Sequence, residues 1–200
     1  MTHNKVSISG VIESDFMLDH EYTNEKFYQF LLSVKRSSSG ATDIIPVIVS
    51  ERLIDVSKNM VGQYVFIEGE FRSFNHHEID KTRLLLYIFP LMIKVIDSEK
   101  YTNDILLEGK ICKEAIFRET PNGRIITDVL LVVDRNYNKC DYIPCIAWGR
   151  NAYYISLLKR GTFIRVAGRV QSRDYNKDCK VKTAYELSIN LVELREGGYY

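Results

Sequence analysis

Apolar and polar residues alternate along much of the chain, which is typical of β-strands that bury one face. The alternation is clear in the second half, where Ile105, Leu107 and Ile111 are interleaved with Glu108 and Lys110. Together with runs of β-branched residues, it predicts four further strands in this half, at Ile125–Val133, Cys140–Trp148, Ile164–Val170 and Tyr185–Leu191.

Between the strands predicted at Cys140–Trp148 and Ile164–Val170, the spacing of the apolar residues changes from the period of a strand to that of a helix. Within Arg150–Lys159, the apolar residues Ala152, Ile155 and Leu158 fall on one helical face, and Gly161 follows as a terminator. Three strands, a helix and two more strands within about 90 residues is the element order of an OB-fold, which is a five-stranded Greek-key barrel.

The first half shows the same element order. Its predicted elements are strands at Lys5–Glu13, Lys26–Arg36 and Asp43–Val49, a helix at Glu51–Met60, and strands at Gln63–Arg72 and Arg83–Ile96. The sequence therefore predicts an all-β protein with one short helix per domain, built from two tandem OB-fold barrels.

An internal repeat with an offset of 99 residues supports this organisation. The offset maps Gly10, Gly62 and Gly69 onto Gly109, Gly161 and Gly168, and Leu31 onto Leu130. The repeat predicts one domain at residues 1–99 and another at residues 100–200. The junction between them falls near Ser98–Thr102.

Charge and aromatic content differ between the two halves, although the net charge of the 200 residues is only +1. Residues 1–100 contain 11 Lys or Arg and 14 Asp or Glu, whereas residues 101–200 contain 16 and 12. Nine of the 13 tyrosines and the single tryptophan also lie beyond residue 100. This asymmetry indicates that the second half contacts a polyanion.

The chain has no apolar run of the length that a membrane span requires, and its first residues lack the apolar core of a signal peptide. We therefore expect a cytoplasmic protein without a membrane partner, whose cysteines are reduced.

Single-stranded nucleic acid requires cations along the phosphate path and flat aromatic faces on which unstacked bases can lie. The second half interleaves both kinds of side chain. The aromatic candidates are Tyr137, Tyr142, Trp148 and Tyr175, and the cationic candidates are Arg135, Lys139, Arg150, Arg169, Arg173 and Lys177. The even spacing of Arg169, Gln171 and Arg173 predicts a polar, basic strand face that points away from the barrel core.

Three segments of the second half resemble bacterial single-stranded DNA-binding proteins. Asn103–Gly109 resembles their opening strand, Ile143–Arg150 their third strand and its exit, and Arg160–Tyr175 their fourth strand. The likeness extends over residues 103–194. The family stacks bases on aromatic rings at four places, and the counterparts of those rings in this chain are Tyr137, Tyr142, Trp148 and Tyr175.

The resemblance implies a non-catalytic protein that binds single-stranded DNA without sequence specificity in replication, recombination or repair, at the nucleoid. It also implies four OB domains per assembly, which a homodimer of two-domain chains would supply. Replication and repair proteins would be further partners. However, the chain ends at Tyr200 soon after its last strand, so we do not expect recruitment through the acidic tail that family members carry. No metal or cofactor is expected.

The first repeat keeps the framework of the family but not its aromatic set. The corresponding positions lie near Ser38 and at Ile44, Ser50 and His76. Phe74 lies near the last of them and is a candidate for a substitute stacking face, while Arg72, Lys35 and Arg36 are candidates for phosphate contacts. We expect this domain to bind nucleic acid weakly or to serve mainly as a scaffold.

Two other classes of function fit parts of the sequence. A primosome-like accessory protein, which uses an OB surface to hold partners and binds nucleic acid weakly, would account for the first repeat. A nuclease would require a carboxylate cluster for metal-assisted hydrolysis, and the sequence shows none. We therefore do not expect an enzyme.

Two groups of residues could be taken for metal or catalytic sites. The cysteines Cys112, Cys140, Cys145 and Cys179 lack the Cys-x-x-Cys spacing of a zinc site. The segments Asp19-His20-Glu21 and His76-His77-Glu78 contain acid–base groups but fall in predicted loops without a nucleophile motif. We interpret them as polar loop residues.

Overall fold

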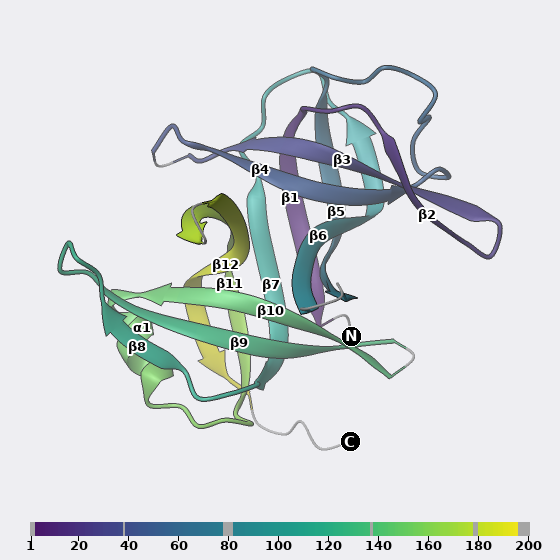
Figure 1. The fold of residues 1–200 in the computed structure, drawn as a ribbon. Helices are drawn as coiled ribbons and strands as arrows, with labels where there is room; N and C mark the ends of the chain where they lie inside the picture. The colour runs from purple at the N-terminus through teal and green to yellow at the C-terminus, as the bar shows by residue number, and fades with distance from the viewer. Residues whose placement is uncertain (1–2, 38, 78–81, 137, 178–179, 196–200) are drawn as a thin grey trace. The chain divides into compact units, whose positions relative to one another are not determined.

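The computed structural model describes the whole chain except residues 1–2, 38, 78–81, 137, 178–179 and 196–200 (Figure 1). The chain divides into two compact units. The N-terminal unit comprises Lys5–Asn103, and the C-terminal unit comprises Asp104–Tyr200 together with Met1–Asn4.

The N-terminal unit is a closed barrel of five strands with one additional strand. Its elements are β1 (Asn4–Ile12), β2 (Met17–Tyr22), β3 (Glu25–Lys35), β4 (Thr42–Ser50), β5 (Tyr64–His77) and β6 (Thr82–Val95). Pairing runs from β3 to β4, β6, β5 and β1, and β1 returns to β3, where Val11 lies opposite Ser33. Closure leaves β2 as a sixth strand that pairs only with β3 among the described residues.

The C-terminal unit repeats this arrangement and adds a helix. Its elements are β7 (Asn103–Ile111), β8 (Ile116–Glu119), β9 (Ile125–Arg135), β10 (Lys139–Trp148), α1 (Gly149–Ser156), β11 (Phe163–Lys177) and β12 (Lys180–Leu194). Pairing runs from β9 to β10, β12, β11 and β7, and β7 returns to β9. The predicted fold class of two tandem OB-fold barrels is confirmed.

Glycines explain why the repeat is visible in the sequence. At Gly69 and Gly168 the register of the β5–β6 and β11–β12 pairs shifts by one residue, and a Cβ atom would collide with a backbone carbonyl oxygen of the neighbouring strand. Gly10 and Gly109 have the same close approach to the strand that closes each barrel. The 99-residue offset therefore repeats the points at which each sheet bends to close.

The helix predicted at Glu51–Met60 is wrong, because the structure has turns and bends throughout that segment. Polar side chains capture the backbone amides that a helix would use: Asp55 accepts a hydrogen bond from the amide of Ser57, and Asn59 accepts one from the amide of Val61. In the C-terminal unit, α1 forms because Ala152 and Ile155 are fully buried on one face of the helix.

Strands β2 and β8 were not predicted, because every residue in them is exposed and they therefore lack the alternation of a half-buried strand. Each pairs with the strand that follows it in a hairpin. The segment Asp19–Glu21 and the pair His76–His77 thus lie in strands β2 and β5, and their assignment to loops is wrong.

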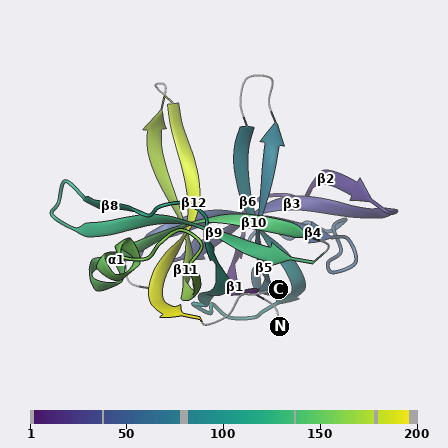
Figure 2. The same cartoon turned by 90° about the horizontal axis from the view of Figure 1, so that it is seen from below.

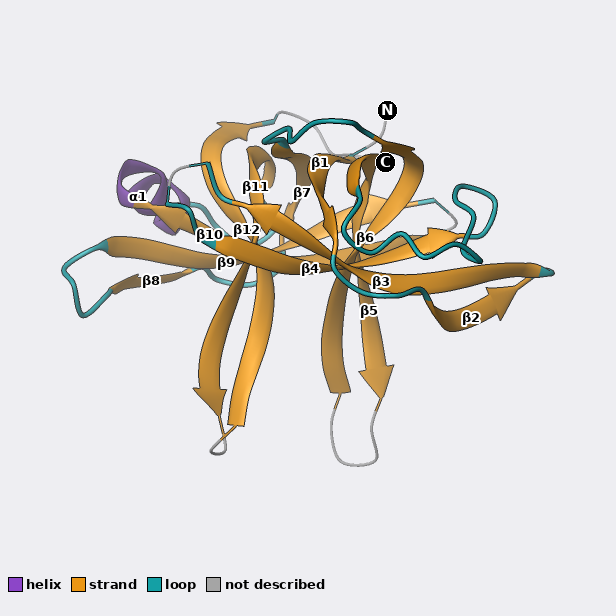
Figure 3. Ribbon diagram, turned by 90° about the horizontal axis from the view of Figure 1, so that it is seen from above, coloured by secondary structure: helices purple, strands orange, loops and turns teal. Residues whose placement is uncertain are grey.

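Strands β5, β11 and β12 are longer than the alternation predicts, whereas β6 has the predicted length. Figures 2 and 3 show the β5–β6 and β11–β12 hairpins extending beyond the body of their own units. Pairing continues to His77 opposite Thr82 in the first hairpin and to Lys177 opposite Lys180 in the second. Phe74 and Tyr175 therefore stand on regular strands, which fixes the side of the ribbon on which each lies.

Candidate nucleic-acid interface

Strand β10 directs two of the candidate aromatics out of the C-terminal barrel. Asp141, Ile143, Cys145 and Ala147 are all at most 3% exposed, so this alternate set faces the core. Tyr142 and Trp148 belong to the other set and are 37% and 38% exposed. We call the side of the β9–β10–β12–β11 sheet that carries these two rings the outer face of the C-terminal unit.

A third candidate ring, Tyr175, lies on the extended part of β11. Val170 is fully buried, and the odd-numbered residues that follow it lie on the opposite side of the strand. Tyr175 is 38% exposed and stands opposite Lys182 of β12. The fourth candidate, Tyr137, lies outside the residues that the structure describes. Three partly exposed aromatic rings are thus placed on strands β10 and β11.

The predicted basic face formed by Arg169, Gln171 and Arg173 is only partly correct. Gln171 is 6% exposed and donates a 2.9 Å hydrogen bond to Glu186, which is itself 5% exposed. The Nε atom of Arg173 lies 3.7 Å from the same carboxylate, and the Nη2 atom of Arg169 lies 3.5 Å from the amide oxygen of Gln171. The centre of this face is therefore a covered polar network around Glu186, and only its edges are cationic.

The remaining candidate cations differ in how far they are exposed. Lys139 and Arg150 are exposed, at the start of β10 and in the first turn of α1. Arg135 lies 3.5 Å from Asp141, a carboxylate that is 1% exposed, so this arginine balances a buried charge. Lys177 lies on β11, but its side chain is outside the described residues.

Sequence reasoning missed the acidic and basic residues that surround these candidates. Besides Glu186, Arg118 of β8 forms a 2.6 Å ion pair with Asp128 of β9. That pair and, more weakly, the charge of Glu186 raise the pKa of Arg118. Strand β8 has no signal in the local pattern because all of its residues are exposed, and the contact between Gln171 and Glu186 has none because it joins two different strands.

In the N-terminal unit, Arg72 and Phe74 lie on the same side of β5. Arg72 contacts Glu70 at 2.8 Å, and its guanidinium carbon lies 3.6 Å from the ring centre of Phe89. Phe74 is 55% exposed. Of the residues at the family's stacking positions, Ile44 is half-buried, Ser50 is buried and His76 is exposed, and Ser38 lies outside the described residues.

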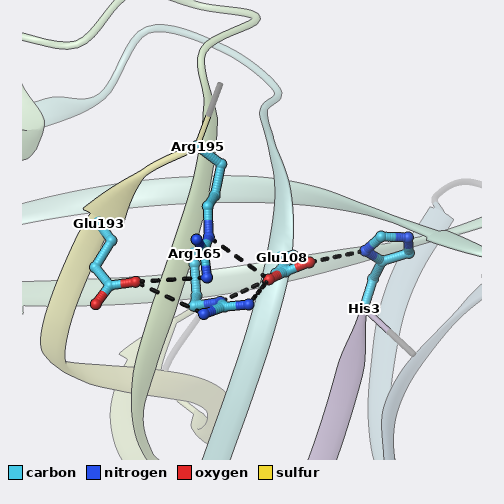
Figure 4. A network of polar contacts seen from close by, with 5 residues as sticks. All are labelled: His3, Glu108, Arg165, Glu193 and Arg195. Atoms are coloured by element: carbon cyan, nitrogen blue, oxygen red, sulfur yellow. Dashed lines mark hydrogen bonds and ion pairs between the residues drawn. The ribbon is translucent and has the colours of Figure 1, made fainter. Parts of the chain in front are cut away.

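A network centred on Glu108 ties the ends of the C-terminal unit to its barrel (Figure 4). The carboxylate of Glu108 on β7 accepts a 2.6 Å hydrogen bond from Arg165 on β11 and lies 3.1 Å from the imidazole of His3. Arg195, just beyond β12, approaches it at 3.8 Å. Burial raises the pKa of Glu108, but the hydrogen bonds from Arg165 and His3 outweigh burial and hold that pKa below its ordinary value.

We expect Glu108→Gln to lower the free energy of unfolding by about 1–3 kcal/mol at pH 7, because the charged hydrogen bonds to Arg165 weaken. A folded-state pKa below the unfolded one gives a contribution that is present above about pH 4.5 and lost as the pH falls through the folded value. The difference between the wild-type protein and the variant, measured by urea unfolding, should therefore shrink below that pH.

The matched control is Glu193→Gln, which removes a carboxylate that lies 3.8 Å from Arg165 and is 45% exposed. A similar loss of stability in both variants, or a difference that persists at pH 3, would contradict the central role of Glu108.

Among the described residues, no helix is long and apolar enough to cross a lipid bilayer. The same residues contain no group of three or more His, Cys, Asp or Glu side chains arranged to hold a metal ion.

Comparisons with known proteins relate the C-terminal unit to a family. Residues 102–195 match the model of the Single-strand binding protein family. The Single-stranded DNA-binding protein A of Bacillus subtilis (strain 168) is 30% identical over 107 residues, which are 48% of this chain and 62% of that protein. The Single-stranded DNA-binding protein of Bacillus anthracis is 31% identical over the same length. The chain thus spans less than two thirds of the length of these relatives.

The solved structures extend the likeness of the fold to both units. The crystal structure of the single-stranded DNA binding protein from Thermus aquaticus superposes with a TM-score of 0.80 and covers 98% of this chain and 95% of its own. The two sequences are 16% identical, so this likeness concerns the fold. The C-terminal unit is thus similar to the Single-strand binding protein family over residues 102–195, which make up slightly less than half of the chain.

Proposed function

We propose that this protein binds single-stranded DNA without sequence specificity and protects it in replication, recombination or repair, without catalysing a reaction on it. The observation that carries the proposal is the placement of Tyr142, Trp148 and Tyr175 on strands β10 and β11, each between 37% and 38% exposed. A ring with this exposure is anchored by its buried part and presents part of its face to solvent. Stacking on such a face accepts any base, at about 1–3 kcal/mol per base.

Phosphates would contact the exposed cations around these rings. Lys139 begins β10 near Tyr142, and Arg150 lies in the first turn of α1, two residues after Trp148. Arg173 precedes Tyr175 by two residues on the same side of β11. Glu186 holds Arg173 at 3.7 Å and leaves about half of its side chain exposed. In this proposal the buried carboxylate orients the arginine, while the guanidinium edge remains open to a phosphate.

Tryptophan fluorescence tests the proposal directly, because Trp148 is the only tryptophan in the chain. We expect oligo-dT to quench the emission, since a base that stacks on the indole replaces the water around its exposed face. Titration with oligo-dT, and with double-stranded DNA as the control, measures the effect. Unchanged emission at a DNA concentration that saturates binding in a gel shift would remove Trp148 from the interface.

The gel shift also separates the other two classes of function. Cleavage of the oligonucleotide when magnesium is present would indicate a nuclease, and absence of both binding and cleavage would favour a primosome-like accessory protein.

We further propose that the chain forms a homodimer, which would bring together the four OB barrels with which the family works. The cytoplasm, at the nucleoid, is its proposed location. Light scattering at micromolar concentration should give about twice the 23.2 kDa mass of one chain. A mass of one chain under these conditions would contradict the dimer.

A further inference from the structure

Each unit buries one aspartate carboxylate near the turn of a hairpin and pairs it with an arginine from the other side of that turn. In the N-terminal unit, Arg36 donates hydrogen bonds of 2.7 and 2.6 Å to the two carboxylate oxygens of Asp43, which is fully buried. In the C-terminal unit, the Nη1 atom of Arg135 lies 3.5 Å from the carboxylate of Asp141, which is 1% exposed.

The two pairs occupy equivalent places in the repeat. The offset of 99 residues maps Arg36 onto Arg135. It also maps Val34, which lies opposite Asp43, onto Val133, which lies opposite Asp141. The pair thus recurs in two units whose surface residues differ, which indicates that it belongs to the frame of the hairpin.

The register of β9 and β10 fixes the side of the hairpin from which Arg135 projects. Val133 and Asp141 lie opposite each other, and both side chains face the core. Arg135 lies opposite Lys139, two residues along each strand and therefore on the same side of the ribbon. Tyr142 follows Asp141 directly, so its ring lies on the other side. Arg135 thus leaves its strand on the side opposite the outer face.

This pair is the buried contact nearest to the turn. Among the described residues of 134–140, every side chain except that of Arg135 is exposed, so packing contributes little to holding this end of the hairpin. A buried carboxylate is strongly unfavourable without a cation, so the pair opposes any movement that would separate its partners. The position of the first residues of β10, up to Tyr142, therefore depends on it.

We propose that Asp141 and Arg135 are positioning residues for the DNA interface. Their pair fixes the end of β10 and with it the direction of the Tyr142 ring, and Arg135 contacts no phosphate. The proposal rests on the proposed function of the protein. It replaces the expectation, drawn from the sequence, that Arg135 is one of the cations along the phosphate path.

The N-terminal unit supplies the matched control. Asp43 is buried like Asp141 and has an arginine partner, but the residue that follows it is the half-buried Ile44 and not an aromatic ring. Asp43→Asn should therefore lower the urea midpoint about as much as Asp141→Asn does, because each leaves an arginine without its carboxylate. It should leave the affinity for oligo-dT within about twofold of the wild type.

The experiment measures oligo-dT binding by the full-length protein and its dependence on salt. We expect Asp141→Asn and Arg135→Gln each to weaken binding about tenfold, because a ring that is not held in place loses most of its stacking contribution. The salt slope should stay unchanged in both variants, since no phosphate contact is removed. In a Tyr142→Ala background, Asp141→Asn should have little further effect on affinity, whereas a general loss of structure would weaken binding in either background.

The outcomes separate this inference from the proposed function. If the wild-type protein fails to bind oligo-dT, the proposed function is wrong and the positioning role falls with it. If the wild-type protein binds but Arg135→Gln lowers the salt slope by about 0.7, Arg135 is a phosphate contact, and only the positioning role is overturned. An equal loss of affinity in Asp43→Asn and Asp141→Asn, or an equal effect of Asp141→Asn with and without Tyr142, would overturn it as well.

A conservative variant covers the case in which a substitution unfolds the protein. Circular dichroism shows which variants are folded. Arg135→Lys keeps a cation beside the carboxylate but lacks the planar guanidinium, so it should be folded and bind oligo-dT more tightly than Arg135→Gln. Its loss of affinity should again disappear in the Tyr142→Ala background, and a loss that persists there would contradict the positioning role.

Discussion

Replacing both Trp148 and Tyr175 with alanine is expected to weaken oligo-dT binding by about 2–6 kcal/mol. Each substitution removes one partly exposed ring, and the two rings stand on different strands, β10 and β11, so their contributions should add. Both side chains project from the outer face and are 38% exposed, so their removal leaves the barrel interior intact. Equilibrium titration with labelled oligo-dT measures the change.

The control for this experiment lies in the other unit. Phe74→Ala removes one ring that is 55% exposed and should cost clearly less than the double change, because the dominant interface remains. Circular dichroism must first show that each variant is folded. If Phe74→Ala weakens binding as much as the double change, then the C-terminal unit is not the dominant interface and the ranking of the two units is wrong.

Salt should weaken binding by about 20-fold between 50 and 200 mM. The estimate assumes three phosphate contacts, from the exposed cations Lys139, Arg150 and Arg173, and a slope of about −0.7 per contact for single strands, so log affinity falls by about 2 for each decade of salt. Titrations at four salt concentrations give the slope.

Removal of one contributing charge should change that slope by a predictable amount. Arg173→Gln should reduce it by about 0.7, whereas Lys110→Gln, which neutralises an exposed lysine on β7, should not change it. A slope near zero for the wild-type protein would mean that the exposed cations do not contact phosphate.

The covered network around Glu186 changes what the cationic residues can be expected to do. Arg169 and Arg173 looked equivalent in the sequence, since both follow the same alternation. In the structure the side chain of Arg173 is exposed beside the carboxylate. The side chain of Arg169 is less exposed and lies next to Gln171. Charge counts along a strand therefore overstate the number of cations available to a phosphate.

The sequence by itself determined the two barrels and the outward direction of three rings. A strand has a period of two residues, so Ile143 and Cys145 lie on one side of β10 and Tyr142 and Trp148 on the other, although Ile146 of the second set is buried. The repeated glycines were equally informative, because a strand that bends to close a barrel leaves no space for a Cβ atom at Gly69 or Gly168. Strand alternation and the glycines at bends both depend on neighbouring residues in the chain, so the local sequence pattern is sufficient to predict them.

Only the tertiary structure decided which charged side chains are exposed to solvent and which aromatic side chains of the N-terminal unit lie together. Glu186 meets Gln171 across β11–β12, and Arg72, Phe89, Phe27 and His20 meet from four strands. Seven of the nine phenylalanines lie in the first hundred residues, but that count does not show which of them share a surface. Such contacts depend on strand register and barrel closure, which bring together residues that no local pattern connects.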